Sequence, residues 1–592
     1  MNTDQIIVIL TIVFIIIALY KELMRPPVTF LVAIVGLNIF GILSPKDILA
    51  GFSNEQIAVI ILLLIIGDLV QSTNVLDRWF DRIFRKAKTY NGFLIRMMAY
   101  VATASAFFNN TPLVAMLMPY TFSWSKRNQV VVSKLLIPLS YAAILGGAAT
   151  LIGTSTNLIV GGLVAEAQAE IEIESIGIFD FVYVGVPMIV IGMLYILLVG
   201  KHLLPIKRGV MFDFRSSKRE YVVETKVKED SRLIGKTVSE AGLRNLTGLF
   251  LVEIIRGEEQ LSPVKPEDRI QSGDHLIFAG ETTTVADLID KDFGLSLPKN
   301  AYTLNDNGTG VLEAVIPFNS NLIGKKIRES DFRSRFDASI LAVHRNGEKL
   351  AGRIGDIVLK SGDLLLLIGG KEVFKRIEGY NVFYILSQVK QISDVKKTKV
   401  IIVLVGLFAA IVLSSLKIVS LFIGLLVLLA FMFISKMITM GQLKKSTRFN
   451  IVMIAGLALA LGKAMMITGT ADYLAEGVVA ILEPHGILVT MFGIYLVTNI
   501  LAGYMTNVAA VSIIFPIVLS TSIQLGVNPT PFILLIAFAS SANFFTPVGY
   551  QTNLMVYSAG GYKFNDFLKI GVPLSLIYMV VAVLVLYYMY QL

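Results

Sequence analysis

Apolar and polar positions divide the chain into two apolar blocks separated by a polar segment. Apolar runs of about 17 to 25 residues, enough to cross a bilayer, lie at 5–20, 27–43 and 56–72 and continue less regularly through 93–200. A second apolar block runs from about 397 to 590. The first run follows Met1–Gln5 without the basic residues and cleavage site of a signal peptide, so we expect a retained first span.

The segment between the blocks is charged throughout and shows strand-like alternation, for example at Leu364–Leu367 beside Lys360 and Asp363. With 55% hydrophobic residues and a positive mean hydropathy, the whole chain is too apolar and too long for one soluble domain. The predicted domains are a membrane half at 1–206, two soluble modules at 207–300 and 301–395, and a second membrane half at 396–592.

Lysine and arginine predict the orientation, because cytoplasmic loops carry an excess of both. The basic clusters are Lys21/Arg25, Arg78/Arg82/Arg85/Lys86/Lys88, Lys126/Arg127/Lys134, Lys201/Lys207/Arg208, Lys396/Lys397/Lys399 and Lys436/Lys444/Lys445/Arg448. The loop at 165–175 carries glutamates and no basic residue, and none occurs between Lys463 and Lys563. We therefore expect a multi-pass protein of the cytoplasmic (inner) membrane with the soluble segment in the cytoplasm. Residues 77–88 have the pattern of an interfacial helix or of an ordinary amphipathic connector.

Polar residues interrupt two apolar segments near their midpoints. Segment 93–122 is broken at Asn109–Pro112 and has basic residues at both ends, so we expect it to enter from the cytoplasm and return there. Segment 487–523 is broken at Thr506–Asn507 and lacks basic residues at its ends, so we expect it to be re-entrant from outside. Two re-entrant hairpins of opposite direction are typical of an inverted-topology repeat.

The membrane halves also share short motifs at matching spacings. Asn110 and Asn507 are each followed by a proline at the same distance. Thr-Asn-Leu then occurs at 156–158 and 552–554, and a glycine pair follows each copy. Four matches in the same order indicate a duplicated unit.

Unpaired backbone groups are tolerated at membrane depth only where they line a cavity or bind something. Asparagine and threonine supply neutral oxygens for a cation and donors for an anion, and helix N-termini add a positive dipole. The paired breaks therefore predict an anion site without arginine. For isolated residues such as Ser140 we prefer helix packing as the explanation. Asp68 and Lys463 lie near predicted span ends, where snorkelling or an ion pair would satisfy them, so we leave them out of the site.

At these residues the sequence resembles the divalent-anion/sodium symporter family, whose members carry dicarboxylates, citrate or sulfate. That family has Ser-Asn-Thr at each hairpin tip, and the matching positions read Asn-Asn-Thr at 109–111 and Thr-Asn-Val at 506–508. A broken helix follows each tip, here at 153–157 and 547–553. Val508 stands where the second threonine is expected, which leaves the identity of the anion open.

The resemblance implies two sodium sites and one anion site. The first sodium site would use Ser105, Asn109, Asn110 and the backbone at Gly153, and the second Thr506, Asn507 and the backbone at Ala502 and Gly549. The anion would contact Asn109, Asn110, Thr111, Thr154, Thr506, Asn507, Val508 and Tyr550. The resemblance also implies a homodimer and an elevator motion, in which the hairpin unit slides against a fixed scaffold.

The soluble insert contains a repeat of its own. The repeated motifs, all at one offset, are Leu-Ile-Gly-Lys at 233–236 and 322–325, Ser-Gly-Asp at 272–274 and 361–363, and an arginine at 256 and 345. We expect two α/β modules, with each Ser-Gly-Asp forming a tight turn that opens a strand. The pattern is similar to the C-terminal domain of TrkA-type potassium-transport regulators. Such domains pair with each other and in some proteins bind small ligands, so we weigh scaffolding equally with sensing of an unknown small ligand.

The remaining chemistry narrows the function. The chain has no cysteine and four widely separated histidines, so disulfides and thiolate metal sites are excluded and a zinc site is not expected. The net charge of +9 lies largely in the loop clusters, so we do not expect nucleic acid as a partner. No set of nucleophile, base and orienting residue stands out, so we expect neither an enzyme nor a cofactor apart from sodium as the coupling ion.

The sequence therefore predicts an α-helical polytopic membrane protein with two re-entrant hairpins, about 11 spans and a cytoplasmic α/β insert of two TrkA-C-like modules. The expected function is a sodium-coupled symporter of sulfate or a di- or tricarboxylate in the lipid bilayer. Two alternatives are a channel regulated by the TrkA-like modules, although no Thr-Val-Gly-Tyr-Gly filter occurs, and an anion-sensing receptor.

Overall fold

The structure is a computed structural model of the 592-residue chain. It describes residues 1–21, 23–71, 84, 87–168, 171, 173–207, 222–243, 249–257, 259–261, 264–280, 295–296, 311–317, 320–345, 348–350, 354–369, 373, 376, 382–385, 397–416, 418–435, 437–438, 443 and 449–592. Most of the expected interfacial helix at 77–88, the side chain of Asp68 and part of the basic clusters lie outside the described residues.

The first membrane half is helical, in the order that the apolar runs predict. Its helices are α1 (Thr3–Tyr20), α2 (Pro26–Ile39), α3 (Pro45–Phe52), α4 (Glu55–Gln71), α6 (Tyr90–Ser105), α7 (Asn110–Arg127), α8 (Leu136–Gly147), α9 (Ser155–Ala167), α10 (Val182–Tyr195) and α11 (Lys201–Leu203). The run at 27–43 ends as a helix at Ile39, earlier than expected, because Gly41 takes a left-handed φ of 75° and Ser44 caps the separate helix α3.

The second membrane half repeats this order. Its helices are α17 (Lys397–Ser415), α18 (Leu421–Ile434), α20 (Phe449–Ile467), α21 (Thr470–Leu482), α22 (Ile487–Tyr504), α23 (Asn507–Gln524), α24 (Pro529–Ser541), α25 (Gln551–Ala559) and α26 (Phe564–Met589). Among the described residues, six helices are long and apolar enough to cross a membrane, or seven with the bent pair α20–α21, and five shorter apolar helices accompany them. The expectation of a polytopic helical protein is confirmed, whereas the count of about 11 spans stays a prediction.

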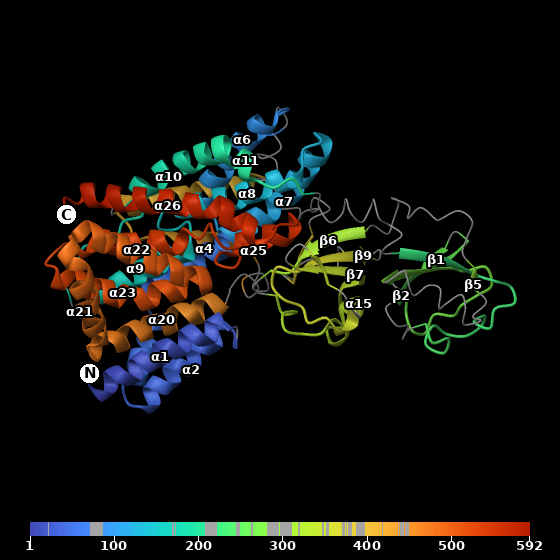
Figure 1. Ribbon diagram of the computed structural model, residues 1–592, viewed down its shortest axis with the longest axis horizontal. Helices are drawn as coiled ribbons and strands as arrows, with labels where there is room; N and C mark the ends of the chain where they lie inside the picture. Colours follow the sequence, from blue (N-terminus) through green and yellow to red (C-terminus); the bar gives the residue numbers. More distant parts are fainter. Residues whose placement is uncertain are drawn as a thin grey trace.

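Two helical hairpins enter the bundle from opposite ends. The α6–α7 hairpin has its open end on the side of the soluble insert, and the α22–α23 hairpin has its open end on the side where both termini lie (Figure 1). Their tips meet the breaks between α8 and α9 and between α24 and α25. Every residue of α8, and every residue of α24 after Pro529, is buried, so these two half-helices form the centre of the fold.

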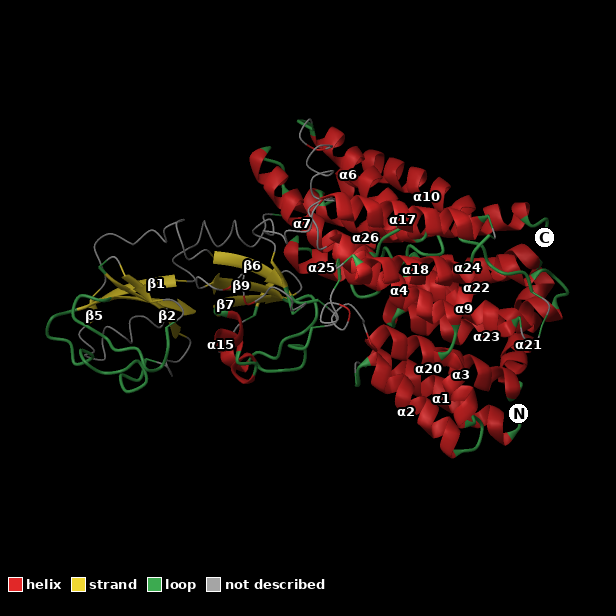
Figure 2. Cartoon of the chain, turned by 180° about the vertical axis from the view of Figure 1, so that it is seen from behind, coloured by secondary structure: helices red, strands yellow, loops and turns green. Residues whose placement is uncertain are grey.

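The insert consists of two five-stranded antiparallel sheets of the same topology. Both lie on one side of the helical body (Figure 2). The strands are β1 (Val222–Val227), β2 (Leu249–Arg256), β3 (Glu259–Leu261), β4 (His275–Gly280) and β5 (Leu295–Ser296) in the first, and β6 (Val311–Val315), β7 (Ala338–Arg345), β8 (Glu348–Lys349), β9 (Leu364–Gly369) and β10 (Tyr384–Ile385) in the second. The orders β3-β2-β4-β1-β5 and β8-β7-β9-β6-β10 match strand for strand, and each sheet has a register shift at the equivalent place in β2 and β7. The internal repeat of the insert is confirmed.

A buried ion pair closes the Ser-Gly-Asp turn in both sheets. Arg345 donates to both carboxylate oxygens of the fully buried Asp363 at 2.7 Å, and Arg256 does the same to Asp274 at 2.9 Å. Hydrogen bonding to the carboxylate raises the pKa of both guanidinium groups. Gly362 has a φ of 80°, as the sequence predicted for this turn.

We expect Asp363→Asn to destabilise the second sheet by about 3 kcal/mol, because it leaves a guanidinium without its buried counter-charge. Hydrogen exchange of β7 and β9 in the full chain measures the loss. Asp356→Asn is the control, since Asp356 pairs with Arg328 at 2.9 Å on the surface and should cost less than about 1 kcal/mol. Equal effects of the two substitutions would contradict the structural role of Asp363.

Candidate functional site

The tip of the α6–α7 hairpin brings three oxygen atoms together. Ser105 Oγ lies 2.5 Å from Asn110 Oδ1 and 2.7 Å from the carbonyl oxygen of Ala143. A hydroxyl has one proton and can donate it to only one of them. The other oxygen therefore faces a hydroxyl oxygen without an intervening proton, an arrangement that a bound monovalent cation would relieve. Ser105 and Asn110 are both buried.

The loops that break the two central helices are fastened by the same hydrogen bonds in both repeats. In each, a threonine hydroxyl donates to the backbone carbonyl at the end of the hairpin's first helix and accepts from a glycine N–H, and an asparagine amide donates to the threonine carbonyl. The residues are Thr150, Ala106, Gly153 and Asn157 in the first repeat and Thr546, Gly503, Gly549 and Asn553 in the second. Each break is thus bonded to the tip of its own hairpin. The duplicated unit that the motif spacings indicate is confirmed at the level of individual bonds.

Tyr550 joins the two repeats. Its hydroxyl accepts a hydrogen bond from Asn110 Nδ2 at 2.6 Å and lies beside the side chain of Thr154. Beside it, Thr111 Oγ1 donates to Gln551 Oε1 at 2.9 Å. The tip of the first hairpin, the start of α9 and the start of α25 therefore meet at one place.

The tip of the second hairpin contacts the break between α24 and α25 through Asn543. Asn543 Nδ2 donates to Asn507 Oδ1 at 3.4 Å, while Asn543 Oδ1 is buried and has no hydrogen-bond partner among the described residues. A buried acceptor without a donor costs about 1–3 kcal/mol. A bound cation would satisfy this oxygen.

The four helices that begin at the site differ in how their N-termini are capped. Asn109 and Thr506 accept backbone N–H bonds in the first turns of α7 and α23. Thr154 and Tyr550, which precede α9 and α25, make no such bond. Because the first turn of a helix has amide groups without intrahelical acceptors, α9 and α25 present donors and positive dipole to whatever lies between them.

The other predicted residues occupy different positions around this centre. Ala502 is fully buried in α22. Gly153 and Gly549 lie in the breaks, where an added Cβ would come within 2.5 Å of the Gly147 carbonyl oxygen and 3.1 Å of Thr546 Oγ1 respectively. Val508 packs against apolar clusters, so its methyl groups replace the expected hydroxyl with core contacts.

One family model matches nearly the whole chain. The family model described as a citrate transporter matches residues 11–421 and 408–592. The chain belongs to the citrate transporter family.

Curated relatives of this family member agree with a transport role. A putative sulfur deprivation response regulator of Chlamydomonas reinhardtii is 33% identical over 555 residues, which cover 92% of this chain and 94% of that protein. An uncharacterized transporter of Synechocystis sp. is 31% identical over 584 residues, 96% of this chain and 94% of that one. Sodium/sulfate cotransporter 1 of Chlamydomonas reinhardtii is 24% identical over 775 residues, 96% of this chain and 88% of that one. The two relatives named as transporters support an anion transporter, and the resemblance to divalent-anion/sodium symporters is confirmed.

Several residues at the breaks between α8 and α9 and between α24 and α25 were not predicted from the sequence. Gln551, Asn543 and the threonine pair at 150 and 546 were not singled out, although the two threonines occupy equivalent places in the repeats. Ser140, which we assigned to helix packing, bonds Thr552 Oγ1 at 2.8 Å and Asn553 Oδ1 at 2.7 Å. It therefore links α8 of one repeat to α25 of the other, a role that packing alone does not describe.

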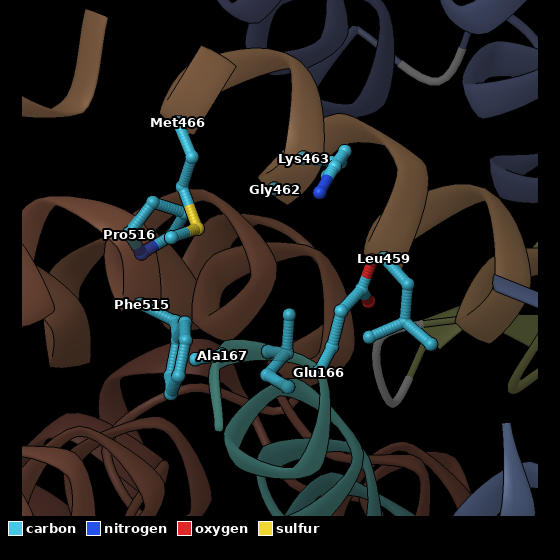
Figure 3. Close-up of a pocket in the computed structure, with 9 residues that line it drawn as sticks. Glu166, Ala167, Leu459, Gly462, Lys463, Met466, Phe515 and Pro516 are labelled. Carbon is cyan, nitrogen blue, oxygen red and sulfur yellow. The ribbon is translucent and has the colours of Figure 1, made fainter. Parts of the chain in front are cut away.

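Lys463 lies apart from the hairpin tips. It lines a small pocket between α9, α20 and α23, in which its side chain and that of Glu166 lie among apolar residues such as Leu459 and Met466 (Figure 3). None of the hairpin-tip residues lines this pocket. This placement agrees with leaving Lys463 out of the anion site.

Proposed function

We propose that this member of the citrate transporter family is a secondary active symporter that carries sulfate together with sodium. The observation that carries the proposal is the convergence of the two uncapped helices α9 and α25 on the Asn110–Tyr550–Thr154 contact. Helix N-termini favour anions. The sodium/sulfate cotransporters among the relatives support the same substrate pair.

The side chains at the contact are neutral donors, which suits an anion that is fully ionised and has no proton to give. The oxygen of Gln551 accepts from Thr111, so the amide group of Gln551 is left to donate. Together with the first-turn amides of α9 and α25, it would surround a sulfate with N–H and O–H groups. A dicarboxylate is the competing substrate, and the loss of the second-tip hydroxyl at Val508 favours the smaller anion.

Sodium would bind where a buried oxygen at a hairpin tip has no proton to accept. The first position is formed by Ser105, Asn110 and the Ala143 carbonyl. The second is formed by Asn507 and Asn543, whose free amide oxygen is buried. Placing each cation at a hairpin tip next to the anion gives a physical reason for coupled binding, since each charge stabilises the other.

The orientation of the bundle in the membrane follows from its basic residues. Lys21, Arg25, Lys126 and Arg127 lie at the helix ends near the insert (Figure 1), and the positive-inside rule then assigns the insert to the cytoplasm. We extend the proposal to a homodimer in the cytoplasmic membrane that works by an elevator motion, and to TrkA-C-like folds for the two modules. The homodimer and the elevator motion rest on the resemblance to the symporter family, the folds of the modules rest on the resemblance to TrkA-type regulators, and the choice of membrane rests on the basic clusters.

Uptake of radiolabelled sulfate into proteoliposomes containing the full chain tests the proposal. We expect uptake that requires an inward sodium gradient, is unchanged by a potassium gradient and is competed by thiosulfate more strongly than by succinate. Electrogenic potassium flux without sodium would indicate a channel instead. Uptake of succinate in preference to sulfate would overturn the substrate assignment.

A second candidate function is an anion-sensing receptor, which the name of the sulfur-deprivation relative favours. A receptor would bind sulfate, seen as a shift in thermal unfolding, but would not move it into vesicles. Binding with sodium-driven flux would exclude a receptor without transport.

A further inference from the structure

The second sheet of the insert rests on α25, the half-helix whose start carries Tyr550 and Gln551. β6 lies against α25, as both ribbon views show (Figures 1 and 2). The turn before β9 approaches α25 closely, because a Cβ added to Gly362 would lie 2.8 Å from Cγ and Cδ1 of Leu554. Leu554 follows Asn553, which fastens the break to the site.

An apolar pair under this turn completes the contact. Val315 on β6 and Leu364 on β9 face each other across the sheet, and both are buried in the same apolar cluster as Tyr557 of α25. We call Val315, Leu364 and Gly362 the docking patch. Glu348 adds an exposed ion pair to Lys563, just before α26, at 3.1 Å.

The first sheet lacks this patch, although its backbone is the same. The positions equivalent to Val315 and Leu364 are Lys226 and His275, which face each other in the same register. Gly273 is the counterpart of Gly362 and has nearly the same φ, 81° against 80°, yet a Cβ there meets no atom of the described residues within 4 Å. The two sheets therefore differ in sequence at the place where one docks and the other does not.

The docked sheet also reaches a part of the bundle that does not carry the hairpins. Arg25, at the start of α2, approaches the carbonyl oxygen of Ile323 at 3.5 Å. α2 packs on α1 and α20. The second sheet thus contacts both α25 and the start of α2.

We propose that the second sheet is a restraint on the transport step: the docking patch holds α25 in its present position relative to α2, and it must separate from Leu554 before the site changes its access. The inference rests on the proposed function, because it assumes that α25 moves with the site. A ligand or partner of the insert that loosens the patch would then raise the transport rate without touching the anion.

The test exchanges residues between the two sheets. In the full chain, Val315→Lys with Leu364→His gives the docking sheet the residues that the first sheet already carries at these positions, so the strand pairing is expected to survive. The control is the reverse exchange, Lys226→Val with His275→Leu. We expect the first pair to raise the maximal rate of sulfate uptake about fivefold with an unchanged KM, which corresponds to about 1 kcal/mol, and the control to leave the rate unchanged.

Hydrogen exchange of residues 551–559 in the same proteins gives a readout that needs no substrate. We expect faster exchange in α25 for the docking-patch variant and for Gly362→Ala, and wild-type exchange for Gly273→Ala, which bears the same backbone strain without the contact. Unchanged exchange in the docking-patch variant, or uptake that falls in it, would overturn the restraint. If the wild-type protein itself takes up no sulfate, the proposed function fails, and the exchange of α25 alone decides whether the patch holds the helix.

Discussion

Asn110→Ala should reduce sodium-coupled sulfate uptake about 100-fold, which corresponds to about 2.7 kcal/mol. Asn110 offers an oxygen toward Ser105 and donates to Tyr550, so alanine removes an oxygen of the proposed sodium site and takes one partner from each of these two buried hydroxyls. The measurement is the initial rate of uptake as sodium is varied. We expect the same direction for Asn507→Ala, which removes the partner of Asn543.

The matched control is Asn128→Ala, at the other end of the same hairpin. Asn128 donates to the Trp124 carbonyl at the end of α7, away from the tip, so uptake should stay within about twofold of wild type, as expected for a change of a few tenths of a kcal/mol. A normal sodium affinity in Asn110→Ala would remove Asn110 from the cation site even if the rate fell.

Gly147→Ala should reduce uptake nearly as much, although it adds only one methyl group and no charge. The new Cβ would lie 2.5 Å from Asn110 Nδ2 and 2.7 Å from its Oδ1, too close for either atom to remain in place. Because the amide is held on both sides, it cannot swing away without breaking a bond to Ser105 or Tyr550. We expect a fall of about tenfold or more, or at least about 1.4 kcal/mol, in the same uptake assay.

A double-mutant cycle separates this mechanism from general misfolding. If the methyl group acts through the amide, Gly147→Ala should have little further effect in an Asn110→Ala background. Gly161→Ala serves as the control, because its Cβ would meet Leu151 at an ordinary 3.4 Å. Additive losses in the double variant would show that Gly147 matters for another reason.

Local patterns carried the prediction of the hairpins and of the two sheets. The break at 109–112 is visible because polar residues interrupt an apolar run, and the turn at 361–363 is visible because its glycine recurs at a fixed offset. The first signal is local, and the second is a repeat at a fixed spacing. The Ser-Gly-Asp turn lies where the repeat indicates it, whereas the first break lies at 106–109 and Asn110–Pro112 already belong to the first turn of α7.

The contacts between repeats had no such signal. Tyr550 meets Asn110 across more than 400 residues, and Ser140 meets Asn553 in the same way. These pairs depend on how two already folded halves pack, which neither periodicity nor motif spacing encodes. The docking of one sheet on α25 was hidden for the same reason, although the apolar pair Val315 and Leu364, set against Lys226 and His275, was present in the sequence to be compared.

The bonds that fasten each break to its own hairpin, and Tyr550 that fastens one repeat to the other, tie the proposed binding centre into one hydrogen-bonded unit. Such a unit can be carried across the bilayer without being rebuilt on arrival. The dissociation constant for the anion, measured at equal sodium, should then be the same in vesicles sealed right side out and inside out. The ion gradient alone, and not a difference in affinity between the two sides of the membrane, would then set the direction of net transport.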